Sequence, residues 1–445
     1  MTLPAPAGGA PAAAPDPSDD PTLNALRPLI FGDEYTLHVT VRDAVMALGD
    51  VPESGIAYPR LVRRLVGALG GAAEVISADP WLRGALCEWV AVAAPRLLPM
   101  VSAEFHTSSG TALQDARMDL ANASMASARA AVAMLVDHGP WVDAVRHDVV
   151  SAMAAIYVAT AVGVEARDRV GAGIDGDPAG ALWAMLAKAQ LSETCRSVLA
   201  VCRLHTSQTV LVDHLPDWEF LAEGICGAAG RNLDLTVAAG GLPRHVAVAS
   251  APQGLDITAL TAWEAPAALP WWHAMLRERE QAFAAAVRES RVDVFGTTDF
   301  DSLAVQMAEA SWNRLAVECL AAAAQQISDP QARDLVSDLV AFWALEKVKA
   351  HGLWHAAYGQ VLADRAALVE VDAELTRRRT ALTQRLPLLV RAFDVPRLPT
   401  PILSAGHLAA RQRNARWEHL SSADAEPAQQ SGGVKRGEVS DASRW

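Results

Sequence analysis

The chain of 445 residues is 51% hydrophobic and 20% charged, and its formal net charge is −13. This apolar fraction excludes a disordered chain and suffices for two or more packed cores. The acidic balance argues against nucleic acid as a partner, because neutralising phosphates requires a basic face. The N-terminus lacks the basic and apolar segments of a secretion signal, and no apolar run of about eighteen residues is free of charge or proline. We therefore expect a cytoplasmic protein without a membrane span.

The five cysteines indicate neither a disulfide framework nor a zinc ribbon. They are odd in number and scattered, and they form no CxxC pair, whereas both kinds of site need paired or closely spaced cysteines. We expect reduced thiols at all five positions, which are Cys87, Cys195, Cys202, Cys226 and Cys319.

Both ends of the chain have a composition typical of disordered tails, which we place at 1–25 and 416–445. The first helical pattern after the N-terminal tail lies in YPRLVRRLVGALGG, and Gly70 and Gly71 are expected to end it. Its apolar residues share one helix face, with arginines on the other side. These apolar residues are Leu61, Leu65, Val66 and Leu69.

Long helical periodicities dominate the rest of the chain. They cover 112–138, 141–170, 181–211, 271–291, 302–327, 332–358 and 364–393. Short breaks rich in Gly, Pro and Asp separate them, which is typical of antiparallel helix bundles. The VAVAS stretch from Val246 is too short to build a sheet. The sequence therefore predicts an all-α fold of two bundle regions, divided near Pro252 to Leu255 and the following ALTAWEAPAALP loop.

Two short motifs resemble ligand-binding patterns, but an ordinary structural role explains each of them better. GAGIDG contains Gly171, Gly173 and Gly176 in GxGxxG spacing, but a dinucleotide fingerprint requires a preceding strand, and here a charged helix precedes it. We interpret it as a loop between helices. His351 and His355 in HGLWH lie four residues apart, a spacing that places two imidazoles on one helix face. No third ligand is evident, so we expect half-buried histidines and no metal site.

The segment from Trp271 to Pro396 contains several motifs in a fixed order. They are WWHAMLREREQAF, SWNRLAVECL, AFWALEKVKAHGLWH and, most specific, QRLPLLVRAFDVP from Gln384. In order and in detail this segment resembles the C-terminal helical domain of acyl-CoA oxidases. The likeness continues more thinly upstream, in LANASMASARAAVAMLVDHG and AMLAKAQLSETCRSVLAVCR, and ICGAAGRN resembles a CG loop of the family.

Near the start, RGALCEWVAVAAPRLLPMVSAEFHTSSG resembles an N-terminal segment of bacterial oxidases. Family members continue from there into a lid region and a β-barrel domain that packs on the flavin. This chain instead passes from His106 and Gly110 to the next bundle helix within a few residues. The resemblance therefore implies helical bundles without the β-barrel domain: a reduced N-terminal region at 26–110, an acyl-CoA dehydrogenase-like bundle at 111–250 and an oxidase C-terminal-like domain at 251–415.

The resemblance also implies that catalytic groups have been lost. Acyl-thioester dehydrogenation, as the family performs it, needs a carboxylate to remove the α proton and a flavin to accept hydride. In LTVAAGG, Ala238 or Ala239 stands at the place of the glutamate, and alanine cannot take a proton. The family's arginine to the flavin pyrophosphate has no counterpart in DHGPWVDAVRHD, where Arg146 is out of register. We therefore expect no catalytic residue.

The leading hypothesis is a non-catalytic subunit of a hetero-oligomeric, flavin-dependent acyl-CoA or acyl-thioester oxidase or dehydrogenase. Family members build each flavin site across a subunit boundary, so this chain would supply scaffold and a loop beside FAD held by a full-length acyl-CoA oxidase-like flavoprotein. FAD is then expected only with that partner, and none on the chain alone. The loop residues are Cys226, Gly227, Ala228, Ala229 and Gly230.

Two alternatives stay open. The first is a flavin-independent enzyme that cyclises or dehydrates an acyl thioester or a polyketide and is active alone. Its candidate polar residues, for which we favour ordinary solvated or capped roles, are Glu104, His106, His205 and Asp213. The second alternative is a homodimeric binding or scaffold protein, which predicts self-association without a flavoprotein partner. A bundle face left bare by the missing domain would be apolar and would favour association over a lone monomer.

Overall fold

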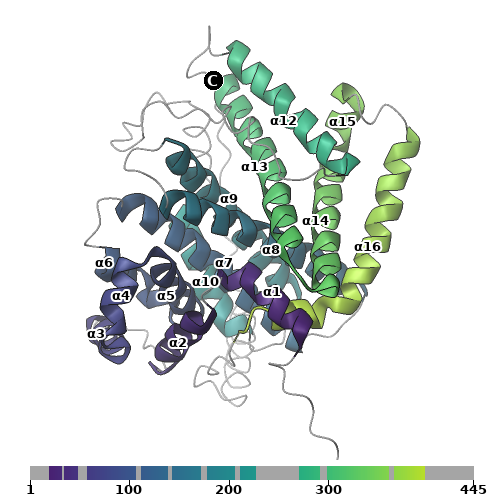
Figure 1. Cartoon of the computed structure of the whole chain (residues 1–445). Helices are drawn as coiled ribbons and strands as arrows, with labels where there is room; N and C mark the ends of the chain where they lie inside the picture. Colours follow the sequence, from purple (N-terminus) through teal and green to yellow (C-terminus); the bar gives the residue numbers. More distant parts are fainter. Residues whose placement is uncertain are drawn as a thin grey trace, which may run out of the picture. The chain divides into compact units, whose positions relative to one another are not determined.

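Helices cover nearly all of the chain that the computed structural model describes. The described residues are 20–32, 35–48, 58–106, 112–138, 143–171, 178–205, 211–226, 270–290, 298–359 and 365–395, and they belong to one unit of the chain, 1–398. No strand occurs among them, so the all-α prediction is confirmed for these ranges (Figure 1). The predicted tail at 416–445, the VAVAS stretch and the loop near Pro252 lie outside them, and the predicted domain boundaries stay predictions.

The N-terminal part of the chain consists of short helices. They are α1 (Pro21–Phe31), α2 (Tyr35–Met46), α3 (Tyr58–Leu69), α4 (Ala72–Ala78), α5 (Pro80–Ala93), the 3-10 turn η4 (Pro95–Leu97) and α6 (Leu98–His106). Asp20 caps α1, because its Oδ1 accepts hydrogen bonds from the backbone N–H groups of Thr22 at 3.1 Å and Leu23 at 3.2 Å. Residues 21–25 of the predicted tail are therefore helical, and Leu23 is buried. The tail prediction is wrong for these five positions because the cap and the proline after it were missed.

The predicted end of the amphipathic helix α3 is confirmed. Gly70 adopts a left-handed backbone conformation with φ +55°, which glycine tolerates and which stops the helix. Of the predicted apolar face, Leu65 and Leu69 are buried, and Val62 joins them. The buried face is thus shifted slightly from the one predicted, towards Val62.

The central helices form the densest part of the core. They are α7 (Ala112–His138), α8 (Asp143–Gly171), α9 (Pro178–His205) and α10 (Leu211–Cys226). Helix α7 packs against α5, α8 and α9, and α8 also packs against α13 (Thr298–Gln326). The span Val145–Arg169 of α8 is long and apolar enough to cross a membrane by length and composition alone, but 78% of its apolar window is buried in the protein. A core helix meets the same criteria, so this span is weak evidence for a membrane.

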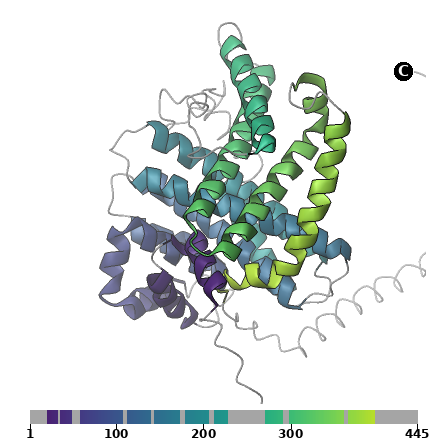
Figure 2. The same cartoon turned by 45° about the vertical axis from the view of Figure 1, so that its right-hand side comes forward.

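The C-terminal helices are α12 (Trp271–Ser290), α13, α14 (Pro330–Ala350), α15 (Gly352–Tyr358) and α16 (Arg365–Arg391). Helices α13, α14 and α16 lie side by side in both views (Figures 1 and 2). The helix predicted at 332–358 is broken into α14 and α15, because His351 leaves the helical conformation with φ −102° and ψ 20°. The prediction of one continuous helix is wrong there, since apolar periodicity does not register a single non-helical residue.

The end of α16 and the residues that follow it contact the central helices and the N-terminal helices. The Tyr157 hydroxyl on α8 donates a hydrogen bond to the Leu389 backbone oxygen at 3.0 Å, and the Tyr157 ring packs on Phe393. Next in the chain, Asp394 Oδ2 accepts from the Tyr35 hydroxyl at 2.9 Å and pairs with Arg42 on α2. The QRLPLLVRAFDVP segment thus contacts both the central helices and the first part of the chain.

Reduced thiols are confirmed at four of the five cysteine positions. Cys87, Cys195, Cys202 and Cys319 are free and buried. The side chain of Cys226, at the end of α10, lies outside the described part.

Candidate functional site

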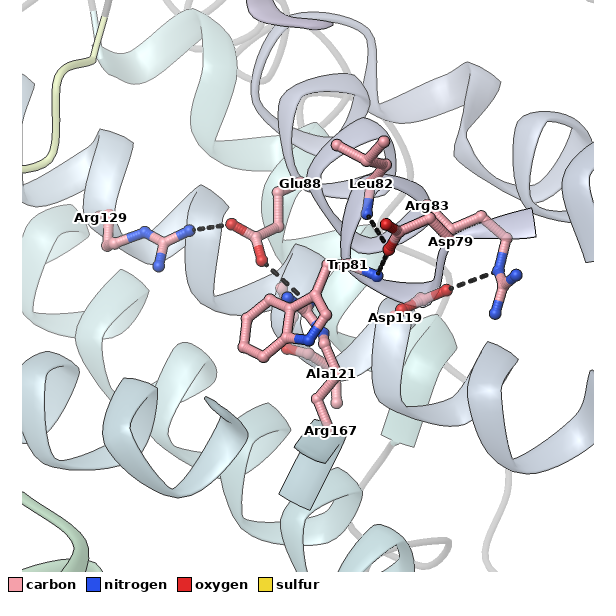
Figure 3. A network of polar contacts seen from close by, with 10 residues as sticks. Asp79, Trp81, Leu82, Arg83, Glu88, Asp119, Ala121, Arg129 and Arg167 are labelled. Carbon is pink, nitrogen blue, oxygen red and sulfur yellow. Dashed lines mark hydrogen bonds and ion pairs between the residues drawn. The ribbon is translucent and has the colours of Figure 1, made fainter. Parts of the chain in front are cut away.

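A buried cluster of charges lies where α5, α7 and α8 meet (Figure 3). Glu88 Oε2 accepts a hydrogen bond from Arg129 at 2.5 Å, and its Oε1 accepts one from Arg167 at 3.2 Å. A second pair, Arg83 and Asp119, lies beside them with 3.6 Å between Nε and Oδ2. Burial alone would raise the pKa of Glu88, but the two arginines outweigh burial and lower it. We call these five residues the Glu88 cluster.

Arg167 connects the Glu88 cluster to a surface groove. Its guanidinium carbon lies 4.8 Å from the centre of the Trp81 ring, which is a favourable cation–π arrangement. Gly84 leaves room for it, because a Cβ at this position would lie 2.6 Å from Arg167 Cζ. Asp79 caps α5 by accepting hydrogen bonds from the backbone N–H groups of Trp81 and Leu82, which places Trp81 in the first turn of the helix (Figure 3).

The groove runs between α1, the start of α5, α8 and the end of α13, and its volume is about 870 Å³. This volume is in the range of sites that hold small ligands. Trp81 forms one wall, and small or aliphatic side chains such as Ala161, Val164 and Ala323 form the floor. Glu165 and Asp168 of α8 add carboxylates to the lining. The described groove therefore combines apolar side chains with carboxylate, amide and hydroxyl groups.

The cysteine of the described groove lining is not an activated nucleophile. Cys319 is the one thiol among the described lining residues, and burial first, then Glu165 and Glu318, raise the pKa of that thiol well above its usual value. A thiol held protonated is a poor nucleophile. Glu165 Oε1 accepts a hydrogen bond from Arg169 Nε at 2.7 Å, so this carboxylate is already engaged.

The groove does not fit a flavin nucleotide. A pyrophosphate group needs cationic side chains or N–H donors, as helix N-termini and arginines supply. Glu165 and Asp168 instead present carboxylates to the groove. The described lining of the groove therefore supplies no cationic side chain for a pyrophosphate.

His38 on α2 is buried beside the Glu88 cluster. Its ring packs between Phe31 and Trp89, with centroid distances of 4.8 and 6.5 Å. Burial first, and then Arg167 and Arg129, lower its pKa to about 4, although Glu88 opposes the shift. The imidazole is therefore neutral in the folded protein at neutral pH.

Acidification from pH 6.5 to pH 4 is expected to lower the free energy of unfolding, in part through His38. In this window the unfolded chain binds the proton and the folded chain does not, so stability falls as the pH falls, by up to about 3 kcal/mol for this residue. The His38→Phe variant, which keeps a ring in the aromatic packing, should show a shallower decline. Urea denaturation at several pH values checks this, and equal slopes for the two proteins would contradict it.

The residues implied by the family resemblance lie largely beyond the described ranges. Cys226 ends α10, but its side chain is not described. The other loop residues, Gly227, Ala228, Ala229 and Gly230, and the lost-base positions Ala238 and Ala239 lie outside the described residues. Their assignment as a flavin contact and as a vanished base stays a prediction.

The candidate polar residues of a flavin-independent enzyme are not brought together by the described structure. Glu104 is exposed on α6, whereas His205 ends α9, where its Nε2 lies 2.8 Å from Asp148 Oδ2. The side chains of His106 and Asp213 are not described. His205 and Asp148 form an ordinary partly buried pair that joins α9 to α8, which favours the structural interpretation.

The GAGIDG interpretation holds where it can be followed, whereas the expectation of half-buried histidines is confirmed for His351 and wrong for His355, which is fully buried beside the Trp354 ring. Helix α8 runs to Gly171, so a helix and not a strand precedes GAGIDG, while Gly173 and Gly176 lie outside the described ranges. His351 and His355 are separated by the break between α14 and α15 and do not share one continuous helix. No group of three potential metal ligands occurs in the described part of the chain, and the absence of a metal site stays a prediction.

Sequence reasoning missed the groove and the Glu88 cluster. The groove lining comes from four helices that are far apart in the chain, and each contributes a few residues of types that are ordinary on a helix. Glu88 lies 41 residues from Arg129 and 79 from Arg167. The only local signal was a set of charged residues within strongly apolar helix segments, which indicates buried pairing but not the partner.

No protein-family model and no curated protein sequence matches the chain. Solved structures of acyl-CoA oxidases match the chain in fold. Acyl-CoA oxidase 3 from Yarrowia lipolytica matches with a TM-score of 0.51 and 10% identity over 76% of this chain and 58% of the oxidase. Acyl-CoA oxidase-1 from Caenorhabditis elegans, complexed with FAD and ATP, matches with a TM-score of 0.50 and 13% identity over 64% of this chain and 50% of the oxidase. The chain thus spans little more than half the length of these oxidases and has an acyl-CoA oxidase-like fold.

Proposed function

We propose, from this acyl-CoA oxidase-like fold, that the chain is a non-catalytic subunit of a hetero-oligomeric, flavin-dependent acyl-CoA or acyl-thioester oxidase or dehydrogenase. One observation carries the proposal. Helix α6 ends at His106 and α7 begins at Ala112, so only five residues, 107–111, join them. The family resemblance places the flavin-packing β domain at this point. Five residues cannot form a domain, so flavin chemistry would require a second chain.

The buried carboxylates of the described structure support this proposal. Glu88 and Asp119 face arginines in the Glu88 cluster, and Glu280 and Glu318 face Arg314 in the α12–α13 pair. A general base for proton abstraction is typically desolvated without a cationic partner, so that its pKa rises towards neutrality. The four carboxylates are instead already paired with arginine side chains. They stabilise the helix packing, as a scaffold requires.

A surface beside the predicted flavin loop is a candidate contact for the partner flavoprotein. An ion pair between Arg203 and Glu219 joins the end of α9 to α10. The neighbouring residues in sequence, Leu204 and Phe220, are 72% and 81% exposed. Large apolar side chains left this exposed often mark contact surfaces. Phe220 lies on the helix that ends at Cys226, where the predicted loop begins.

The test is co-expression of the chain with a full-length acyl-CoA oxidase from the same organism. Size-exclusion chromatography with flavin absorbance is expected to show a colourless chain when it is alone and a flavin-containing complex when the two are together. Phe220→Ser should weaken co-elution, whereas Leu353→Ser, at a 91% exposed position on α15, should not. Flavin bound by the chain alone, or two proteins that elute separately, would overturn the proposal.

One observation favours a second candidate function, a binding protein for a small molecule. The groove of about 870 Å³ is lined by Trp81 and by aliphatic side chains such as Leu29, Val164 and Ile327, which suits a ligand with an apolar body. The anionic phosphates of CoA do not suit it. The chromatography experiment separates the two functions, because a binding protein would ignore the oxidase.

A further inference from the structure

A smaller pocket lies between the start of α12, the end of α13, α14 and α16, and its described lining residues differ from those of the groove. Its volume is about 230 Å³. An apolar cavity of about 150 Å³ is already large enough to bind benzene. The pocket, which we call the Trp272 pocket, therefore has room for one aromatic ring with a short substituent.

The inner part of the Trp272 pocket is apolar. Trp272, Ala324, Val340 and Ala341 line it, and all four side chains are buried. Apolar side chains at this depth suit an aliphatic or an aromatic body, because the ligand removes apolar surface from water. The indole favours an aromatic body, since two rings gain an additional attraction in offset or edge-to-face contact.

The polar lining residues are more exposed and form the mouth of the pocket. Gln325, Arg333 and Ser337 are exposed, and Arg378 is partly buried. Each of these side chains carries N–H or O–H donors. No carboxylate occurs in the described lining. The mouth therefore suits a ligand group that accepts hydrogen bonds.

Arg333 is the cation of the mouth whose charge no ion pair within the described chain compensates. Its guanidinium Nη2 donates to the Ser328 backbone oxygen, a neutral acceptor, at 3.2 Å. Asp329, one turn earlier, instead accepts a hydrogen bond from the Ala332 backbone N–H as the cap of α14. Asp334, the next residue, does not line the pocket. The remaining N–H groups of Arg333 can therefore serve a ligand.

The second arginine of the mouth has its charge balanced within the protein. Arg378 donates to Glu374 from Nε and to Asp338 from Nη1, at 2.6 Å in each case. These two carboxylates are engaged with Arg378 and are not among the lining residues. The charge available to a ligand at the mouth is thus the single positive charge of Arg333.

We infer that the Trp272 pocket binds a small aromatic carboxylate, with its ring against Trp272 and its carboxylate at Arg333. A guanidinium can donate two parallel hydrogen bonds to a carboxylate, and such charge-assisted bonds are stronger than neutral ones. A cationic ligand does not fit, because the described lining has two guanidinium groups and no carboxylate. The inference does not depend on the proposed function, which concerns other surfaces of the chain.

The test is a ligand-observed NMR titration of the full chain with hydrocinnamate at neutral pH. We expect saturable binding with a Kd of about 0.1–1 mM, as for a compact ligand of this size. Hydrocinnamamide has the same shape without the charge and should bind at least about fivefold more weakly. Phenylpropylamine, which is cationic, should not bind. Absence of hydrocinnamate binding, or equally tight binding of the amide or the amine, would overturn the inference.

Matched arginine variants locate the carboxylate. Arg333→Met is expected to weaken hydrocinnamate binding about tenfold, because it removes the guanidinium. Arg333→Lys, which keeps the charge but not the paired donors, should give an intermediate loss. Arg385→Met removes the same charge from an exposed position on α16 outside the lining and should keep the affinity. If Arg333→Met and Arg385→Met weaken binding equally, general surface charge holds the ligand and the inference fails.

A pocket-filling variant locates the ring. Ala321 lines the pocket and is only partly buried, so a larger side chain can be placed there without overpacking the core. Ala321→Leu is expected to weaken hydrocinnamate binding at least about tenfold, because the leucine occupies the space of the ring. Ala356→Leu, at an exposed position on α15, is the control. Circular dichroism verifies that each variant folds, and unchanged binding by a folded Ala321→Leu protein would contradict the inference.

Discussion

Replacement of Arg314 by methionine is expected to lower the free energy of unfolding by about 3–5 kcal/mol. Arg314 on α13 donates to Glu280 on α12 through Nη2 at 3.0 Å and to Glu318 through Nη1 at 2.5 Å. All three side chains are fully buried, and His273 pairs with the far side of Glu318. Methionine fills similar volume but leaves two carboxylates buried and close together without a cation. Removing one partner of a buried ion pair is costly for this reason.

Urea denaturation measures this effect, and a second arginine supplies the control. Arg203 pairs with Glu219 but is 62% exposed, so Arg203→Met should cost less than about 1 kcal/mol. Adding Glu280→Gln to Arg314→Met should restore part of the lost stability, because one of the stranded charges is then removed. Equal losses for the Arg314 and Arg203 variants would contradict the proposed role of burial.

The Glu88→Gln variant is expected to lower the free energy of unfolding by a comparable amount. Glu88 is the shared carboxylate of Arg129 and Arg167, and the side chains of all three are 6–7% exposed. Glutamine keeps the shape but loses the charge, so two arginines become stranded in the core, at a cost of about 3–5 kcal/mol. Arg167 would also lose the carboxylate that holds it over Trp81, so the groove wall should loosen.

A double-mutant cycle with Arg129→Met tests the pairing directly. The double variant should be destabilised by less than the sum of the single variants, since removing the second partner releases the uncompensated charge. Tryptophan fluorescence gives a separate readout of the groove, although several tryptophans contribute. Strict additivity of the two losses would show that Glu88 and Arg129 do not act as a pair.

Local patterns in the sequence determined the helices of this protein. The predicted helix at 112–138 coincides with α7, and that at 271–291 with α12 to within one residue. Helical periodicity and terminating residues such as Gly70 act within a few turns, so a single sequence contains the information. The same local signals did not predict the break between α14 and α15 at His351. They also did not predict that α1 begins at Pro21, after the capping residue Asp20.

Only the tertiary structure decided which charged residues form ion pairs and where the groove lies. Glu88 and Arg167 are 79 residues apart, and the groove lining is shared by α1, α5, α8 and α13. The folded packing also decides that His38 lies between the Phe31 and Trp89 rings. The physical reason is that ion pairing, burial and cavity shape depend on contacts between distant segments, whereas helix formation depends on neighbours in the chain.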